Sequence, residues 1–227
     1  MDDPSFLPYR PQRLTAAQME ERAAAFYAEM DARRSVRMFS ADPVPRRLIE
    51  LAIRTASTAP SGAHQQPWTF VAVSDPQVKR RIRVAVEEEE KRSYEGRMSD
   101  EWLDALKPFA TDEHKPFLET VPWIVVLFEQ TRGTFPDGSV RKHYYAREST
   151  GIAAGLFVTA IHHMGLATLT HTPSPMGFLR DMLGRPASER PFVLFPIGCP
   201  ADDAEVPDLA RKGLDEVAVF DPSISDT

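Results

Sequence analysis

The sequence predicts an α+β domain in which a mixed central sheet is flanked by helices. Helical patterns come first along the chain, and short apolar runs of strand length then alternate with helical segments of unequal length. This irregular spacing favours an α+β fold over a regular doubly wound one. With 227 residues, 42% of them apolar, the chain is long enough to bury one substantial core. No Gly/Ser-rich or low-complexity stretch divides the interior, so we expect one domain.

Two helices are expected before the first strand. Thr15 followed by Gln18 is a capping box, and residues 16–32 are rich in Ala, Glu and Met, which favour helix. Residues 42–45, Asp-Pro-Val-Pro, open a second helix whose apolar residues recur every three or four positions until about Thr58. Later helical patterns cover residues 78–94, 100–107, 112–119, 143–164 and 176–183. The segment 143–164 is rich in small, weakly polar residues and is expected to form the core helix.

Four apolar runs are expected to form the sheet, at residues 68–73, 123–128, 166–170 and 192–197. The run from Trp123 to Phe128 is continuously apolar, which is typical of a strand covered on both faces. We therefore place it in the middle of the sheet. The tripeptide Pro136-Asp137-Gly138 predicts a turn after it.

Composition excludes several classes of protein. Lys and Arg number 27 against 33 Asp and Glu, and the net charge of −6 removes the broad basic field that nucleic acids or anionic membranes require. The chain has no signal peptide and no apolar run of about 18 residues, so we expect a soluble, cytoplasmic protein without a membrane partner. The single cysteine, Cys199, excludes an internal disulfide and a Cys-x-x-Cys site. His162 and His163 face different ways on one helix, so we expect no metal site.

A basic cluster follows the first helix. Arg33-Arg34-Ser35-Val36-Arg37 places three guanidinium groups and a hydroxyl within five residues of an acidic chain. Arginine binds phosphate oxygens bidentately, and a hydroxyl adds a short hydrogen bond, so the cluster suits a phosphorylated ligand. The alternative is a solvated basic helix end that is stabilised by the helix dipole.

A loop of small residues follows the second helix. Pro60-Ser61-Gly62-Ala63-His64 lies just before the first strand, where small side chains let backbone N–H groups approach a flat or charged ligand. The alternative is an ordinary turn. A hydrolytic pair of Ser61 and His64 is not expected, because no nucleophile elbow or orienting acid accompanies them.

An acidic run, Glu87 to Glu90, precedes Tyr94. Glu90 and Tyr94 are four residues apart and share one helix face, where a carboxylate and a phenol can converge on a ligand. With the ammonium of Lys115, such a group suits a zwitterionic amino acid. The alternative, which we favour for Glu87 to Glu89, is a solvated helix face.

These motifs together resemble the nitroreductase superfamily of FMN enzymes and, within it, the iodotyrosine deiodinases. The resemblance runs from about Arg33 to about Val219. It rests on R-R-S-V-R, T-A-P-S-G-A-H-x-x-P-W-T-F, E-E-E-E before Tyr94, H-Y-Y, T-x-T-P, L-G-R-P and V-P-D-L-x-R-K.

The resemblance implies an intertwined homodimer of α+β subunits with one FMN in each of two interfacial clefts. Residues 1–32 would be an N-terminal extension with the first helix, 33–220 the FMN domain, and 221–227 a C-terminal tail. The cofactor-binding residues it implies are Arg33, Arg34, Ser35, Val36, Arg37, Pro60, Ser61, Gly62, Thr170, His171, Thr172 and Arg211. Thr172 would be catalytic, with its hydroxyl near flavin N5. The chain departs from the vertebrate pattern at His171, where threonine is usual, and has one residue fewer just after Pro173.

The resemblance also implies the substrate and the reaction. Glu90, Tyr94 and Lys115 would hold the zwitterion of a halotyrosine under a mobile lid at about 87–115, and the Ala63 N–H would receive the phenolate oxygen. FMN would deliver electrons one at a time, and the halide would leave. NAD(P)H would be the ultimate donor, directly or through a flavin or ferredoxin-type reductase.

Three rival functions remain open. A broad-specificity NAD(P)H-dependent nitro- or quinone reductase of the same fold would not need a zwitterion clamp. The flavin-cleaving enzyme that makes dimethylbenzimidazole would have little use for an amino-acid lid. A flavin-bound halotyrosine sensor without turnover would carry the same binding residues as the enzyme, so only an assay separates these two.

Overall fold

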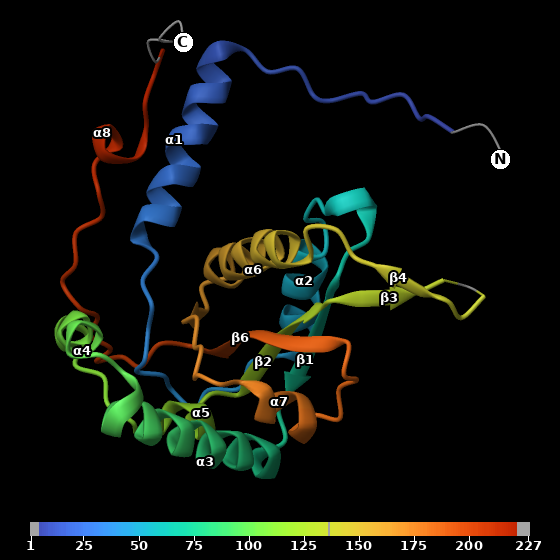
Figure 1. The fold of residues 1–227 in the computed structure, drawn as a ribbon. Helices are drawn as coiled ribbons and strands as arrows, with labels where there is room; N and C mark the ends of the chain where they lie inside the picture. Colours follow the sequence, from blue (N-terminus) through green and yellow to red (C-terminus); the bar gives the residue numbers. More distant parts are fainter. Residues whose placement is uncertain (1–4, 136, 222–227) are drawn as a thin grey trace, which may run out of the picture.

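The structure, a computed structural model, describes residues 5–135 and 137–221. Its centre is a four-stranded sheet in the order β1-β2-β6-β5 (Figure 1). The strands are β1 (Trp68–Val73), β2 (Trp123–Gln130), β5 (Ala167–Thr168) and β6 (Glu189–Gly198), and a separate hairpin pairs β3 (Arg132–Thr134) with β4 (Val140–Lys142). The four expected sheet strands are all present, and β1 agrees with its expected residues at both ends.

The described residues form eight α-helices besides three short 3-10 or π-helical turns. The α-helices are α1 (Ala16–Ala32), α2 (Arg46–Ala56), α3 (Pro76–Arg92), α4 (Asp100–Leu106), α5 (Phe117–Thr120), α6 (Ala146–His163), α7 (Gly177–Met182) and α8 (Leu214–Val217). The expected capping box at Thr15 and Gln18 is present at the start of α1. The third helix starts two residues earlier than expected because Asp75 caps it, accepting hydrogen bonds from the N–H groups of Gln77 and Val78.

The α+β class is confirmed, whereas the sheet differs from the mixed one that we expected. Each strand pairing in it, β1 with β2, β2 with β6 and β5 with β6, is antiparallel in the described part of the chain. Hydrophobic periodicity records which side chains face the core and carries no information on the direction of the neighbouring strand. The long helical segment between β1 and β2 does not indicate either whether these two strands are parallel or antiparallel.

Helices cover both faces of the sheet, α2 and α6 on one and α3, α5 and α7 on the other (Figure 1). Strand β2 explains this arrangement, because it lies in the middle as expected and alternates between two cores. Val125 and Leu127 pack under Phe157 of α6, whereas Ile124, Val126 and Phe128 pack against α3 and α5. A continuously apolar strand is therefore required at this position.

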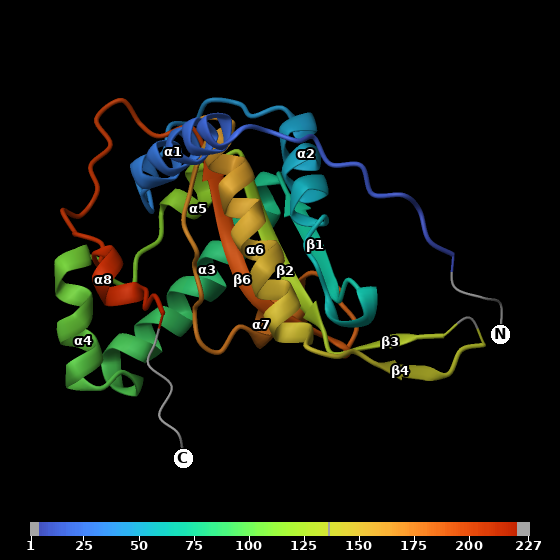
Figure 2. The ribbon, with the colours of Figure 1, turned by 90° about the horizontal axis from the view of Figure 1, so that it is seen from above.

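The two ends of the chain lie away from this body. Helix α1 contributes no buried residue, and Figures 1 and 2 show it and the segment before it extending from the sheet. Apolar side chains along both ends face solvent, with Phe6 85%, Tyr27 70% and Phe220 75% exposed. Among the residues that the structure describes, no helix is long and apolar enough to cross a membrane.

The structure tests two further expectations only in part. The turn at Pro136-Asp137-Gly138 joins β3 to β4, a hairpin that the sequence did not predict, and Pro136 itself lies outside the described residues. The strands flanking it have only three residues each and lack a clear alternation, so they gave no strand signal. Of the expected C-terminal tail at 221–227, all but Asp221 lies outside the described residues.

Candidate functional site

The basic cluster forms one wall of a cavity of about 190 Å³. Arg211 reaches the cluster from the segment after β6, and its guanidinium donates to the Asp31 carboxylate at 2.8 Å and to the Arg33 carbonyl at 2.7 Å. Tertiary structure thus joins two segments that are far apart in the sequence. The expected phosphate-binding residues that line this cavity are Arg33, Arg34, Ser35, Arg37 and Arg211.

The charges in this cavity call for an anion. Partial burial lowers the pKa of Arg33, and the positive charges of Arg211 and Arg34 lower it further. Like charges held this close repel one another, and a phosphate group between them would remove that cost while accepting several bidentate hydrogen bonds. The cavity therefore fits the phosphate of FMN. It offers no alternative metal centre, because no group of three or more His, Cys, Asp or Glu side chains gathers within residues 5–135 and 137–221.

Two further cavities continue from the phosphate end. One, of about 480 Å³, shares Arg33 and Ser35 with the basic cavity and ends at Thr170. The other, of about 770 Å³, is also lined by Thr170 and adds Thr172. Gly151 and Gly155 of α6 carry no side chain into the space along this path. Together the three cavities form a trough that begins with cations and ends with hydroxyl groups, which suits a flavin mononucleotide.

The segment from Thr170 to Thr172 is fixed by backbone pairing. The N–H of His171 donates to the Leu194 carbonyl of β6, and the Leu194 N–H donates back, both at 2.9 Å. Because side chains alternate along an extended segment, Thr170 and Thr172 face the trough and are exposed, whereas His171 is buried on the other side. The side chain of His171, an expected cofactor-binding residue, therefore does not line the trough. Val36 is fixed nearby, its N–H donating to the Thr168 carbonyl at 3.3 Å.

The expected carboxylate, phenol and ammonium come together beside this segment. Glu90, Tyr94 and Lys115 line a cavity of about 200 Å³ that also contains Thr172 and Arg37. The Lys115 Nζ lies 3.7 Å from Glu90 Oε2 and 5.9 Å from the centre of the Tyr94 ring, whose hydroxyl donates to the Thr111 carbonyl. This cavity adjoins the trough at Thr170 and Thr172.

Burial makes the charges in this cavity costly. Lys115 is only 3% exposed, and burial lowers its pKa, while the nearby carboxylates of Glu90 and Asp112 raise it. Burial likewise raises the pKa of Glu90, against the opposing charge of Lys115. At 3.7 Å the two groups attract each other without a short hydrogen bond. Lys115 Nζ also donates to the Asp112 carbonyl and the Thr111 hydroxyl, which leaves one of its three N–H groups for a ligand.

The expectation that Glu87 to Glu89 form a solvated face is wrong for two of the three. Glu87 accepts from the Lys115 backbone N–H at 2.6 Å and from Arg83 at 2.7 Å, so it fixes the position of Lys115. Glu89 pairs with Arg92 and Arg97, both at 2.6 Å. The spacing of Arg83 and Glu87, four residues apart, was an available signal for the first of these pairs. Glu88 remains exposed.

The loop of small residues lies elsewhere in the chain. Residues 62–64 form a 3-10 turn in which the Gly62 N–H donates to Ser149 near the start of α6, and Ala63 has a φ of 50°. No acceptor in the described part of the chain takes the Ala63 N–H. The basic cluster lies near the other end of α6, where His162 contacts the Glu29 carbonyl.

The two groups are well separated along α6. Thirteen residues separate Ser149 from His162, which corresponds to about 20 Å of helix. None of the four cavities described above is lined by Pro60, Ser61, Gly62 or Ala63. The fold of the single chain therefore does not bring this loop to the basic cluster.

Comparison with known proteins identifies the family and the fold. The Nitroreductase family matches residues 30–199, so the chain belongs to the nitroreductase family. An iodotyrosine deiodinase of Haliscomenobacter hydrossis is 55% identical over 217 residues, which cover 96% of this chain and 97% of that protein. One from Danio rerio is 45% identical, covering 94% and 73%. Within the nitroreductase family, the chain thus belongs with the iodotyrosine deiodinases.

A solved structure supports the same assignment. A crystal structure of oxidized iodotyrosine deiodinase bound to FMN and 3-iodo-L-tyrosine matches with a TM-score of 0.74 and 28% identity, covering 88% of this chain and all of that one. More distant nitroreductase-type structures, such as one from Bacteroides thetaiotaomicron at 20% identity and a TM-score of 0.61, share the fold.

Proposed function

We propose that this protein is an FMN-dependent oxidoreductase that reductively dehalogenates halotyrosines to tyrosine and halide. The observation that carries the proposal is the cavity of Glu90, Tyr94 and Lys115 beside Thr172, because it combines a zwitterion-binding set with the end of an FMN-shaped trough. The relatives named as iodotyrosine deiodinases, and the related structure that contains FMN and 3-iodo-L-tyrosine, support the same reaction. We extend the substrates to bromo- and chlorotyrosine, which share the zwitterion and the ortho-halogenated phenol.

The basic cluster would hold the phosphate of FMN. Arg33, Arg34, Ser35, Arg37 and Arg211 supply guanidinium and hydroxyl donors in one cavity, and neutralising their mutual repulsion favours binding. When bound, FMN supplies two electrons, one at a time, for replacement of the carbon–halogen bond by carbon–hydrogen. One proton is also consumed and halide is released. The Thr172 hydroxyl, at the end of the trough, would hydrogen-bond the flavin and so act as the catalytic residue.

The ammonium and carboxylate groups of the substrate would each bind a side chain of opposite charge. Glu90 binds its ammonium, Lys115 its carboxylate, and the Tyr94 hydroxyl adds a hydrogen bond. Closure of the lid at 87–115 excludes water and strengthens these interactions. The Ala63 N–H donates a hydrogen bond to the phenolate oxygen of the substrate. An ortho halogen lowers the phenol pKa from about 10, so halotyrosine binds as the anion at neutral pH in preference to tyrosine.

We also propose an intertwined homodimer. Helix α1, which buries none of its residues, and the exposed apolar side chains of both chain ends need a partner surface. The separation of about 20 Å along α6 between the basic cluster and Ser61–Gly62 further supports a site to which each subunit contributes one of these groups. Figure 1 shows α1 and α8 standing clear of the sheet, where a partner could cover them.

The electron donor and location complete the proposal. NAD(P)H is the ultimate reductant, acting directly or through a flavin or ferredoxin-type reductase. The lone cysteine, Cys199, is free, which suits the reducing cytoplasm.

The decisive experiment is anaerobic. The FMN-loaded protein is reduced with dithionite and mixed with 3-iodotyrosine, while flavin absorbance, tyrosine and iodide are measured. We expect reoxidation with one tyrosine and one iodide per flavin. Flavin that stays reduced with iodotyrosine yet reoxidises with a nitroarene would instead indicate a nitroreductase. Ligand binding without turnover would indicate a sensor.

A matched pair of variants tests the clamp. Glu90→Gln should weaken binding of 3-iodotyrosine by about 10- to 150-fold, the equivalent of a lost hydrogen bond to a charged group, while FMN stays bound. Glu88→Gln, on the exposed face of the same helix, should leave the dissociation constant unchanged. Equal affinities for the two variants would remove the clamp from the proposed site.

A further inference from the structure

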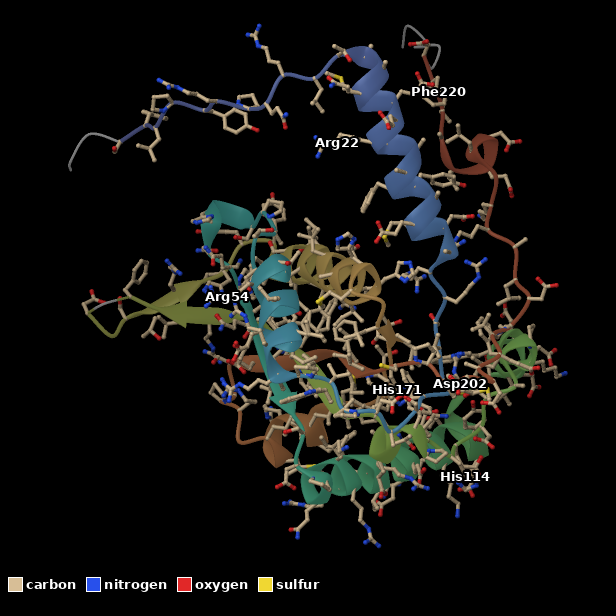
Figure 3. The ribbon with its side chains drawn as sticks, turned by 180° about the vertical axis from the view of Figure 1, so that it is seen from behind. Arg22, Arg54, His114, His171, Asp202 and Phe220 are labelled. Atoms are coloured by element: carbon tan, nitrogen blue, oxygen red, sulfur yellow. The ribbon has the colours of Figure 1, made fainter. Side chains whose placement is uncertain are left out.

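His171 is a buried titratable group that the proposed reaction does not use. Its backbone belongs to the trough, held between Thr170 and Thr172 by its pairing with Leu194, but its ring faces the opposite way. The residue is only 8% exposed. Figure 3 labels it within the body of the molecule, in contrast to the outlying Arg22 and Phe220.

The ring lies between Phe117 at the start of α5 and Glu90 near the end of α3, where the proposed lid begins. The His171 and Phe117 rings are nearly perpendicular, with 6.2 Å between their centroids, and His171 Nε2 lies 3.7 Å from Glu90 Oε1. Nε2 is buried and has no hydrogen-bond partner among the described residues. A buried ring nitrogen without a hydrogen-bond partner is costly, so its direction toward a carboxylate calls for an explanation.

The charged surroundings keep the ring neutral. Burial, followed by the positive charges of Lys115 and Arg37, lowers the pKa of His171 to about 3. Four titratable or charged groups of the same cavity lie around it: Glu90 from α3, Tyr94 from the turn after α3, Lys115 from the segment before α5, and Arg37. A neutral imidazole has one N–H to donate. Among these four groups, the Glu90 carboxylate is the one that lies within 4 Å of Nε2.

Two side chains thus face the two oxygens of the Glu90 carboxylate. Its Oε2 lies 3.7 Å from Lys115 Nζ and its Oε1 lies 3.7 Å from His171 Nε2, both slightly beyond hydrogen-bond distance. A small movement of the proposed lid toward the sheet would shorten the contact between Glu90 Oε1 and His171 Nε2 into a hydrogen bond. If Lys115 turns to the carboxylate of a bound amino acid, His171 remains as the donor that holds Glu90.

We propose that His171 is a positioning residue for the amino-acid site: its Nε2–H donates to Glu90 Oε1 and orients the other carboxylate oxygen toward the ammonium of the substrate. The inference rests on the proposed function, since it assumes that Glu90 binds that ammonium. The His171 side chain lines the cavity of Glu90, Tyr94 and Lys115 and none of the three cavities that form the trough. Its effect should therefore depend on the amino-acid part of the ligand.

The test compares two ligands on the FMN-loaded protein by flavin fluorescence titration: 3-iodotyrosine, and 2-iodophenol, which lacks the zwitterion. His171→Leu should weaken 3-iodotyrosine binding by about 5- to 150-fold and leave 2-iodophenol binding within about twofold. His171→Gln, whose amide can donate in place of the ring, should restore most of the affinity. Equal losses for both ligands, or no loss for either, would overturn the assignment.

A second measurement keeps the inference testable if His171→Leu does not fold. His171→Gln and His171→Met are then compared in the natural chain and in the Glu90→Gln variant. His171→Met should weaken 3-iodotyrosine binding relative to His171→Gln in the natural chain and add nothing in Glu90→Gln, because the carboxylate it acts through is gone. Additive effects would overturn the inference. Failure of the natural protein to bind or dehalogenate 3-iodotyrosine would instead defeat the proposed function, and this inference with it.

Discussion

Gly62 offers the sharpest test of how the loop of small residues is built. A Cβ atom placed there would lie 2.4 Å from the Tyr144 carbonyl oxygen and 3.0 Å from its carbonyl carbon. Since real Cβ atoms essentially never approach closer than 3.0 Å, Gly62→Ala must move the two backbones apart by at least the difference, 0.6 Å. The neighbouring atoms are main-chain atoms, so no side-chain rotation can relieve the contact.

The expected loss of stability follows from this displacement. Overpacking of this kind costs about 1–3 kcal/mol, and for a chain of this size each kcal/mol lowers Tm by about 2–4 °C. We therefore expect Tm to fall by about 2–12 °C. The same displacement moves the Ala63 N–H, so dehalogenation of 3-iodotyrosine should fall as well, by up to about 100-fold.

Thermal unfolding of the FMN-loaded protein and steady-state dehalogenation measure both effects. Gly177→Ala is the matched control, because a Cβ at Gly177 meets no atom within 4 Å, and it should melt within about 2 °C of the natural chain. If Gly62→Ala melted and reacted like Gly177→Ala, the reasoning from the Tyr144 contact would be refuted.

Three further changes test other parts of the site. Arg211→Met should weaken FMN binding by about 10- to 150-fold, measured by equilibrium dialysis, whereas Arg54→Met on the exposed side of α2 should not. Thr172→Ala should slow dehalogenation of 3-iodotyrosine more than reduction of a nitroarene, and equal slowing would contradict the assigned role. Because His171 has a pKa of about 3 when folded against 6.5 unfolded, protonation favours unfolding, so the stability it provides above pH 6.5 is lost between pH 6.5 and 3. Thermal unfolding from pH 7 to 4 should therefore decline less steeply in His171→Gln, and parallel curves would count against the buried neutral ring.

Local sequence determined the elements and the chemistry that each one carries. Strand β1 matches its expected residues, Trp68 to Val73, because a short β-branched and aromatic run between prolines has few other conformations. The central position of β2 followed from a run that is apolar at every residue from Trp123 to Phe128. The convergence of Glu90 with Tyr94 was expected from a four-residue spacing on one helix, and the two do line one cavity, although α3 ends at Arg92 and Tyr94 lies in the π-helical turn after it. Lys115 was added through resemblance to a known family.

Tertiary structure alone decided which of these groups meet, and how. The two-residue alternation between Thr170, His171 and Thr172 is visible in the sequence, but only the pairing with Leu194 shows that the threonines face the trough and the histidine faces Glu90. The sequence likewise did not show that Glu87 anchors Lys115. Nor did it show that every sheet pairing among the described residues is antiparallel. Periodicity assigns each side chain to a face of its own element, whereas contacts between distant segments depend on how those elements pack.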